Sequence, residues 1–192
     1  MKLKISDLSC YEQREGWLLD GFNLEASAGD FIEVKGLSYA SGAVLADCIA
    51  GRRNPESGSV LIEKEEDFRS RKPAVSIIDR ETSMLPYLTL WENLLLVLGA
   101  VKKGLSGRAA AMELRSVQEK LDLFQSEYKL PEKLSVRELD RARLAMAILA
   151  APDILVINGL PADGTIQDMA AFTELAKSVC KAVDRIVVMI EC

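Results

Sequence analysis

The 192-residue sequence contains no histidine. Without an imidazole, every mechanism that uses histidine as a general base is excluded, and so are histidine-rich metal sites. The sequence has only four cysteines, and the intervals between them do not match those of metal-binding motifs. We therefore expect no metal site, no cysteine nucleophile and reduced thiols at Cys10, Cys48, Cys180 and Cys192.

Long apolar runs are also missing. No stretch of about 18 apolar residues exists, and Met1-Lys2 does not open an apolar secretory signal. We therefore expect a cytoplasmic protein with no direct membrane insertion. With 29 acidic and 24 basic residues, the formal charge of −5 argues against nucleic acid as a partner. A hydrophobic content of 49% does supply a sizeable core for a single domain.

The apolar patterns alternate between strand-like and helix-like segments. Strands are predicted over residues 2–8, 18–25, 31–34, 60–63, 74–78, 154–157 and 186–190, and helices over 90–101, 107–124, 136–150 and 166–183. This order predicts an α/β fold with a β-rich N-terminal part. We expect an α/β core from residues 1–80 and 135–192, with residues 81–134 inserted as a helical subdomain.

The stretch VKGLSYASGAVL is similar to a phosphate-binding loop of the pattern G-x-x-x-x-G-K-[ST]. Gly36 opens the pattern, and a helix is expected to start near Gly42. The lysine and hydroxyl positions of the pattern, however, hold Gly42 and Ala43. Tyr39 and Ser41 stand where glycines normally let backbone amides approach a phosphate.

Four separated segments, in this order, resemble the ATPase subunit of ABC transporters over nearly the whole chain. They read LLDGFNLEASAGDFIEVKG, PESGSVLI, SMLPYLTLWENL and LSVRELDRARLAMAILAAPDILVI. The resemblance implies a P-loop NTPase-like core of the ABC type, with an inserted α-helical subdomain.

The resemblance also assigns functional positions, and this chain departs from the family pattern at most of them. The Q-loop glutamine position holds Arg80, and the switch-histidine position holds Glu191. Asn158 and Gly159 occupy the positions of the Walker B aspartate and the catalytic glutamate. These replacements remove the charges that hold the metal and orient water in the family.

The signature motif LSGGQ of the family is altered too. Here the segment reads Leu134-Ser135-Val136-Arg137-Glu138. The resemblance further implies an aromatic side chain that stacks on adenine, for which Tyr11 is the candidate and Trp17 the alternative.

Phosphoryl transfer depends on positioning and charge stabilisation, and several of the groups that provide them are replaced at once. We therefore expect a catalytically inactive ATPase-like subunit with no catalytic residues and no ATP or Mg²⁺ cofactor. It would be a structural or regulatory component of an ABC transporter or a transporter-like membrane complex. One alternative is a divergent ABC ATPase that still binds or hydrolyses ATP to drive transport, for which the only acidic candidates near the expected site are Glu33, Glu138, Asp153 and Asp163. Another is a cytosolic scaffold without membrane contact.

In the resembled family, a groove around the Q-loop receives a short helix of the membrane subunit. Its apolar members in this chain would be Leu85, Pro86, Tyr87 and Leu88, with Trp91 behind them. The resemblance thus implies a membrane-embedded transporter subunit as partner, and an intact ABC ATPase as a second candidate. The chain would then be peripheral at the inner face of the cell membrane.

Overall fold

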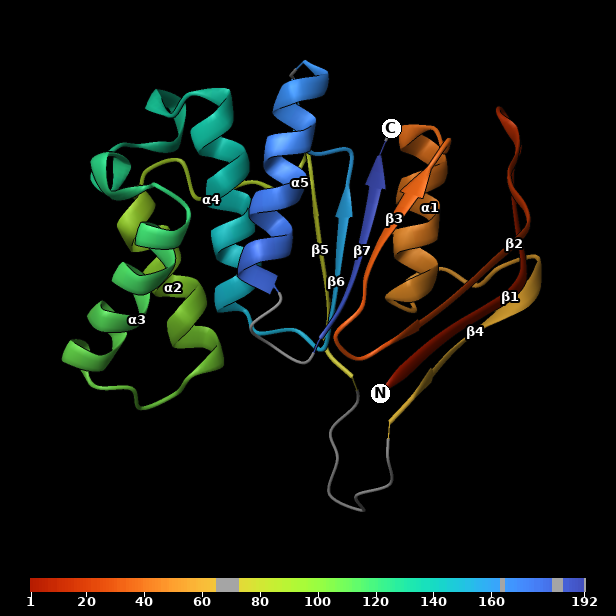
Figure 1. The fold of residues 1–192 in the computed structure, drawn as a ribbon, viewed down its shortest axis with the longest axis horizontal. Helices are drawn as coiled ribbons and strands as arrows, with labels where there is room; N and C mark the ends of the chain where they lie inside the picture. The colour runs from red at the N-terminus through yellow and green to blue at the C-terminus, as the bar shows by residue number, and fades with distance from the viewer. Residues whose placement is uncertain (65–72, 163–164, 181–184, 192) are drawn as a thin grey trace. The chain divides into compact units, whose positions relative to one another are not determined.

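The computed structural model describes residues 1–64, 73–162, 165–180 and 185–191 (Figure 1). The described strands are β1 (Lys2–Glu12), β2 (Gly16–Ser27), β3 (Phe31–Lys35), β4 (Ser57–Glu63), β5 (Val75–Asp79), β6 (Ile154–Asn158) and β7 (Ile186–Glu191). The helices are α1 (Tyr39–Ile49), α2 (Leu90–Val101), α3 (Gly107–Lys120), α4 (Val136–Leu149) and α5 (Ile166–Cys180), with 3₁₀ turns η1 (Phe124–Ser126) and η2 (Pro131–Lys133).

The described residues form two compact units. Unit 1 comprises Met1–Ile77, Pro152–Gly159 and Val183–Cys192, and unit 2 comprises Ile78–Ala151 and Leu160–Ala182. The division expected from the sequence, with residues 81–134 as the helical subdomain, is a different partition and stays a prediction.

Unit 1 contains two sheets with α1 between them (Figure 1). The first sheet has the antiparallel order β2-β1-β4, and the second has the order β3-β7-β6-β5. Strand β6 is buried at every residue, which is typical of a parallel strand in the middle of a sheet. The core of the unit joins both sheets and α1, and includes Leu3, Ile5, Leu45, Ile49, Val156 and Val188.

Parallel pairing fixes the ends of three strands of the second sheet. Strand β7 pairs with β3 on one side and with β6 on the other, so that Val34, Ile190 and Asn158 lie side by side. The carboxyl ends of these strands therefore meet at one edge. Ligands of open α/β sheets bind at this edge, and α1 begins there after the short loop that follows β3.

Unit 2 contains a helical cluster in which α2, α3 and α4 contact one another. Its fully buried side chains include Leu94 and Leu98 of α2, Leu114 of α3 and Leu144 of α4.

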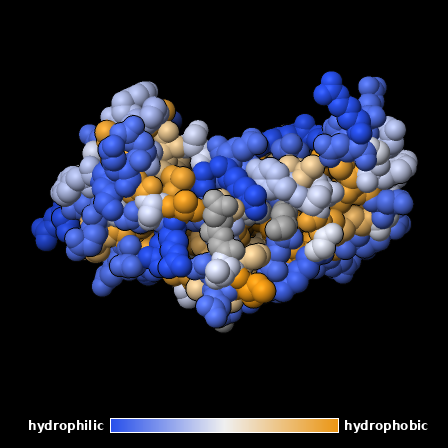
Figure 2. All heavy atoms as spheres, turned by 90° about the horizontal axis from the view of Figure 1, so that it is seen from above, coloured by the Kyte–Doolittle hydropathy of each residue, from blue (hydrophilic) through white to orange (hydrophobic). Residues whose placement is uncertain are grey.

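Figure 2 shows one face of the molecule, which is mostly hydrophilic, with hydrophobic residues between the polar ones. Within the ranges that the structure describes, no helix has both the length and the apolar character needed to cross a bilayer.

A buried asparagine shapes the segment in front of α2. The amide of Asn93 donates to the carbonyl oxygens of Leu85, Leu88 and Thr89 at 3.0–3.1 Å, and its Oδ1 accepts from the Leu85 N–H at 2.8 Å. A capping box between Thr89 and Glu92 fixes the start of the helix. The side chain of Tyr87, in the middle of this segment, is 74% exposed. The segment is thus an ordered turn that presents Tyr87 to solvent.

Candidate functional site

The loop between β3 and α1 consists of Gly36, Leu37 and Ser38. Gly36 has φ +82°, a left-handed conformation that glycine adopts without strain. Ser38 is the N-cap of α1, and its Oγ accepts a hydrogen bond from the Ser41 N–H at 3.0 Å. This cap starts the helix at Tyr39, so the expected start near Gly42 was wrong by about one turn.

The early start places Tyr39, Ser41, Gly42 and Ala43 inside α1 instead of in a long loop. The Gly42 N–H is already bonded to the Ser38 carbonyl at 2.9 Å, as in any helix. The first turn of a helix nevertheless directs N–H groups and the positive end of its dipole outward. The first turn of α1 is therefore an anion-attracting end at the carboxyl edge of the sheet.

Gly42 of α1 packs directly against Asn158, the last residue of the buried strand β6. A Cβ atom on residue 42 would lie 2.2 Å from the Asn158 Oδ1 and 3.0 Å from the Ile190 Cγ2. The Asn158 Nδ2 donates to the Tyr39 carbonyl at 3.4 Å. Asn158 thus fills the space that a side chain at position 42 would need, so the residues at positions 42 and 158 are physically coupled.

Gly159 follows directly at the end of β6. Its φ of +62° lies in the left-handed region, and its N–H donates to the Ile190 carbonyl at 3.0 Å. A glutamate at this position would have to adopt a backbone conformation that costs about 1–3 kcal/mol for a residue other than glycine.

A lysine that the sequence analysis did not consider ends β3 immediately before Gly36. The Lys35 Nζ lies 3.4 Å from a carboxylate oxygen of Glu191 and 3.4 Å from one of Glu33. Glu191 first, and then Glu33, raise the pKa of the Lys35 ammonium. The signal was present in the sequence, because Lys35 directly precedes the first glycine of the loop. Its pairing with Glu191 depends on the β3–β7 register and was not visible.

The nucleotide of the resembled family carries Mg²⁺, so the residues present must be compared with what that metal needs. Ala43 has no hydroxyl, and the Asn158 side chain is completely buried against Gly42. In the described part of the chain, no group of at least three His, Cys, Asp or Glu side chains is placed to hold a metal ion. These donors do not fit Mg²⁺, and we assign no step to it.

Both aromatic candidates for adenine stacking lie on the first sheet of unit 1. Tyr11 of β1 and Trp17 of β2 are register partners, and their rings form a T-shaped pair with centroids 5.4 Å apart. Both rings are accessible, with 43% and 58% of their surface exposed. The two alternatives are therefore neighbouring halves of one exposed aromatic surface.

The predicted Q-loop position, Arg80, and the predicted signature segment both lie in unit 2. Arg143, mostly buried, donates from Nη2 to the Arg80 carbonyl at 2.6 Å and from Nε to the Thr82 carbonyl at 3.0 Å. Its Nη1 bonds the Asp140 carboxylate at 2.9 Å. The Q-loop position is thus anchored through its backbone.

The segment Leu134–Glu138 lies at the start of α4. Ser135 is the N-cap, and a capping box links it to Glu138. The carboxylate of Glu138 also accepts hydrogen bonds from Lys129, at 2.7 Å, and from Ser126. Lys129 first, then Ser126, and after them the Ser135 backbone N–H, lower the pKa of Glu138 to about 2. The S-x-x-E pattern of this capping box was readable in the sequence but was interpreted only as an altered signature.

The acidic candidates for a divergent site are dispersed. Glu33 pairs with Lys35, whereas Asp153 accepts from the Ala74 N–H at 2.7 Å. Glu138 belongs to unit 2, as described above. Asp163 lies outside the described residues. The structure thus brings together the β3–α1 loop, Asn158, Gly159 and Glu191 within unit 1.

Comparison with known proteins identifies the family. A family model described as "ABC transporter" matches residues 19–158, well over half of the sequence. The chain therefore belongs to the ABC transporter family.

Several curated relatives are ATP-binding proteins. The chain is 29% identical over 141 residues to the aliphatic sulfonates import ATP-binding protein SsuB 1 of Rhizobium johnstonii, covering 73% of this chain and 50% of that protein. It is 31% identical over 144 residues to the bicarbonate transport ATP-binding protein CmpC of Synechocystis, covering 73% of this chain and 21% of that protein. The chain thus spans half or less of the length of these two relatives.

Solved structures share the fold. CbiO1 of Clostridium perfringens, part of the ABC transporter complex cbiONQ, gives a TM-score of 0.78 at 16% identity, covering 98% of this chain and 77% of that one. A dimeric bacterial ABC transporter cassette gives 0.78 at 18% identity, with 98% and 87% covered. The predicted α/β fold of the ABC ATPase type is confirmed.

The expectation of a catalytically inactive subunit that is not an enzyme is wrong. The family match and the relatives named as ATP-binding proteins contradict it and favour the alternative of a divergent ATPase. That expectation rested on the side chains at single motif positions. Backbone N–H groups and the dipole of a helix also hold phosphate, and neither depends on the side chains at positions 42 and 43.

The contact of Gly42 with Asn158 generates a stability prediction. Gly42→Ala should lower the free energy of unfolding by about 1–3 kcal/mol, because its Cβ has no room. Gly99→Ala in α2 is the matched control: its Cβ meets nothing within 4 Å, so alanine should stabilise by about 0.5–1 kcal/mol. Urea denaturation measures both. Adding Asn158→Ala should remove most of the cost of Gly42→Ala, and equal effects of the two glycine variants would contradict the contact.

The carboxylate of Glu138 generates a pH prediction. Its folded pKa of about 2 lies below the ordinary value of 4.5, so its contribution is present above about pH 4.5 and is lost as pH falls towards 2. Glu138→Gln keeps the capping box and removes the charge, and should cost about 1–2 kcal/mol near pH 7. The difference from the parent protein should shrink below pH 4.5 and vanish near pH 2. A difference that is independent of pH would show that the Lys129 pair contributes nothing.

Proposed function

We propose that this chain is the ATP-binding subunit of a transporter, a divergent ABC ATPase that binds ATP at the start of α1 and hydrolyses it to drive transport. One observation carries the proposal. The N-terminus of α1 lies at the carboxyl edge of the parallel strands, inside the region that matches the family. The names of the relatives, which refer to ATP binding in the import of sulfonates and the transport of bicarbonate, support it.

Phosphate binding would rest on the first turn of α1 and on Lys35. The helix end supplies N–H groups and a positive dipole, and Lys35 supplies an ammonium one residue before Gly36. Glu33 and Glu191 already neutralise that ammonium. The Lys35 side chain is 65% exposed, so water screens these ion pairs and an incoming phosphate can replace a carboxylate at little cost.

Hydrolysis needs a carboxylate that orients water, and neither Asn158 nor Gly159 carries one. Glu191 is the carboxylate that we assign to this role, because it ends β7 at the same edge as the loop and its side chain is 20% exposed. We expect slow turnover, since a single missing charge-stabilising group costs about 10³- to 10⁵-fold in phosphoryl transfer.

The proposed partner is a membrane-embedded transporter subunit, which would place the chain at the inner face of the membrane. Leu85, Pro86, Tyr87 and Leu88 form its proposed docking turn. Asn93 fixes the backbone of this turn, and Tyr87 and Leu85 are 74% and 38% exposed. An aromatic side chain on an ordered turn is a suitable anchor for a helix of the partner.

Nucleotide binding is tested most sharply at Ser38. Aspartate and asparagine both cap helices as well as serine does, so neither variant should lose stability. Ser38→Asp places a negative charge beside the phosphates and should weaken ATP binding at least tenfold. Ser38→Asn should change it less than threefold. Isothermal titration calorimetry with ATP, in the presence and absence of Mg²⁺, measures the affinities of both variants. Undetectable ATP binding at millimolar concentration, or equal affinities of the two variants, would overturn the proposal.

Hydrolysis is tested separately at Glu191. Glu191→Gln should abolish the release of phosphate without weakening ATP binding, because the carboxylate orients water and competes with the phosphates for Lys35. Glu25→Gln is the control, since Glu25 pairs with Lys4 on the other sheet of unit 1. ATP binding without any phosphate release in the parent protein would leave a binding subunit and refute hydrolysis.

A further inference from the structure

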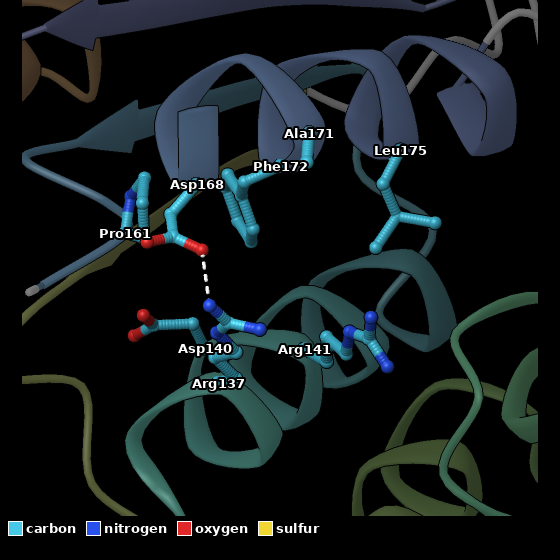
Figure 3. Close-up of a pocket in the computed structure, with 8 residues that line it drawn as sticks. All are labelled: Arg137, Asp140, Arg141, Pro161, Asp168, Ala171, Phe172 and Leu175. Carbon is cyan, nitrogen blue, oxygen red and sulfur yellow. Dashed lines mark hydrogen bonds and ion pairs between the residues drawn. The ribbon is translucent and has the colours of Figure 1, made fainter. Parts of the chain in front are cut away.

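Unit 2 has a hollow of about 220 Å³ between α4 and α5 that the proposed function does not use. Figure 3 shows the residues that line it: Arg137, Asp140 and Arg141 of α4, Asp168, Ala171, Phe172 and Leu175 of α5, and Pro161. Its two walls differ in chemistry. The wall on α4 is charged, whereas Phe172, Leu175 and Ala171 make the opposite wall apolar.

Helical spacing explains the two walls. Asp168 of α5 precedes Ala171 and Phe172 by three and four positions, and Leu175 follows these two by four and three, so all four share one face of that helix. Arg137 and Arg141 are one turn apart on α4. The Arg137 guanidinium points towards Asp168 of α5 (Figure 3), whereas Arg141 pairs with Asp122. A ligand in the hollow would therefore contact an aromatic ring on one side and two guanidinium groups on the other.

The carboxylates in the hollow are already engaged. Asp140 is neutralised by Arg143 at 2.9 Å and also accepts from the Ala162 N–H at 3.0 Å. Asp168 accepts from the N–H and Oγ1 of Thr165, each at 2.9 Å, and Thr165 is the main cause of the lowered pKa of this carboxylate. Asp168 also pairs with Arg137. Neither carboxylate is left to attract a cation.

The two arginines retain capacity for a further acceptor. Arg137 bonds Asp168 through Nη2, and Arg141 bonds Asp122 through Nη1. A guanidinium has several N–H donors in a planar fork, so a ligand carboxylate can bind beside each existing pair. One partner of each pair is well exposed, Arg137 at 75% and Asp122 at 88%, while Asp168 and Arg141 are 24% and 33% exposed. Water therefore screens both ion pairs in part.

We propose that this hollow binds a small organic anion with an apolar body, such as an aromatic or branched carboxylate. Its volume of about 220 Å³ compares with about 30 Å³ for one water molecule in the liquid, so a single ring or branched chain fits. The ring packs on Phe172 and Leu175, and the carboxylate lies between Arg137 and Arg141. A cation is repelled by the two arginines, and a neutral ring loses their hydrogen bonds.

Benzoate is the probe, with benzamide and benzylammonium as neutral and cationic counterparts of similar size. Amide chemical shifts of the full chain, followed during titration, give the affinities. Benzoate should bind with a dissociation constant on the order of 1 mM, in line with its few heavy atoms. Benzamide should bind at least fivefold more weakly, and benzylammonium not at all. Equal affinities for benzoate and benzamide, or no binding at 20 mM, would overturn the proposal.

Variants locate the site. Arg137→Gln and Arg141→Gln should each weaken benzoate at least threefold, and together at least tenfold. Ala171→Trp, at an exposed position, should fill the hollow and abolish binding, while Asp168→Asn should strengthen it by removing a competing carboxylate. Arg108→Gln, an exposed arginine of α3 outside the hollow, is the matched control. Binding that survives Ala171→Trp, or that Arg108→Gln reduces equally, would overturn the assignment.

A variant of the β3–α1 loop distinguishes the hollow from the proposed nucleotide site. Ser38→Asp should leave benzoate affinity unchanged, because Ser38 belongs to unit 1 and the hollow to unit 2. A parallel loss of ATP and benzoate binding in that variant would mean that benzoate occupies the nucleotide loop, and it would refute a separate site.

Discussion

The parallel pairing of β7 with both β3 and β6 is the constraint on which the candidate site depends. It aligns Val34, Ile190 and Asn158, and thereby brings the ends of three separate strands to one edge. A cap at Ser38 then starts α1 directly at that edge. Without this register, Lys35 and Glu191 would not meet, and Asn158 would not lie against Gly42. The site is therefore a property of the sheet more than of the loop sequence.

The contact between Gly42 and Asn158 changes how the altered motif positions are understood. Taken one at a time, each residue is a lost functional group. Together they form a packed pair, because the Asn158 amide occupies the space above a glycine that has no side chain. Inserting a lysine at position 42 alone would thus displace a completely buried residue. The two positions are constrained by packing, so their identities do not report on activity independently.

The sequence predicted the type of most elements because their patterns are local. The apolar run Ile154–Ile157 predicted β6, and the stripe over residues 90–101 predicted α2. The start of α1 was missed because it depends on one hydroxyl, that of Ser38. Contacts such as Lys35 with Glu191 were out of reach, since they join residues far apart in the chain through strand register. The inactive interpretation is contradicted by the family match and by the relatives named as ATP-binding proteins, which lie outside what single motif positions can indicate.

The start of α4 carries two neighbouring charged side chains, Arg137 and Glu138, that bind different partners. Glu138 directs its carboxylate towards Lys129 and Ser126, which stabilises the first turn of the helix from within unit 2. Arg137 turns instead to Asp168 of α5 and to the hollow beside it. In the pattern LSGGQ, the position of Arg137 holds glycine and that of Glu138 holds glutamine, both uncharged, whereas here Glu138 supplies a structural anchor and Arg137 a guanidinium. Glu138 therefore stabilises unit 2, whereas Arg137 lines the hollow in which we propose that an anion binds.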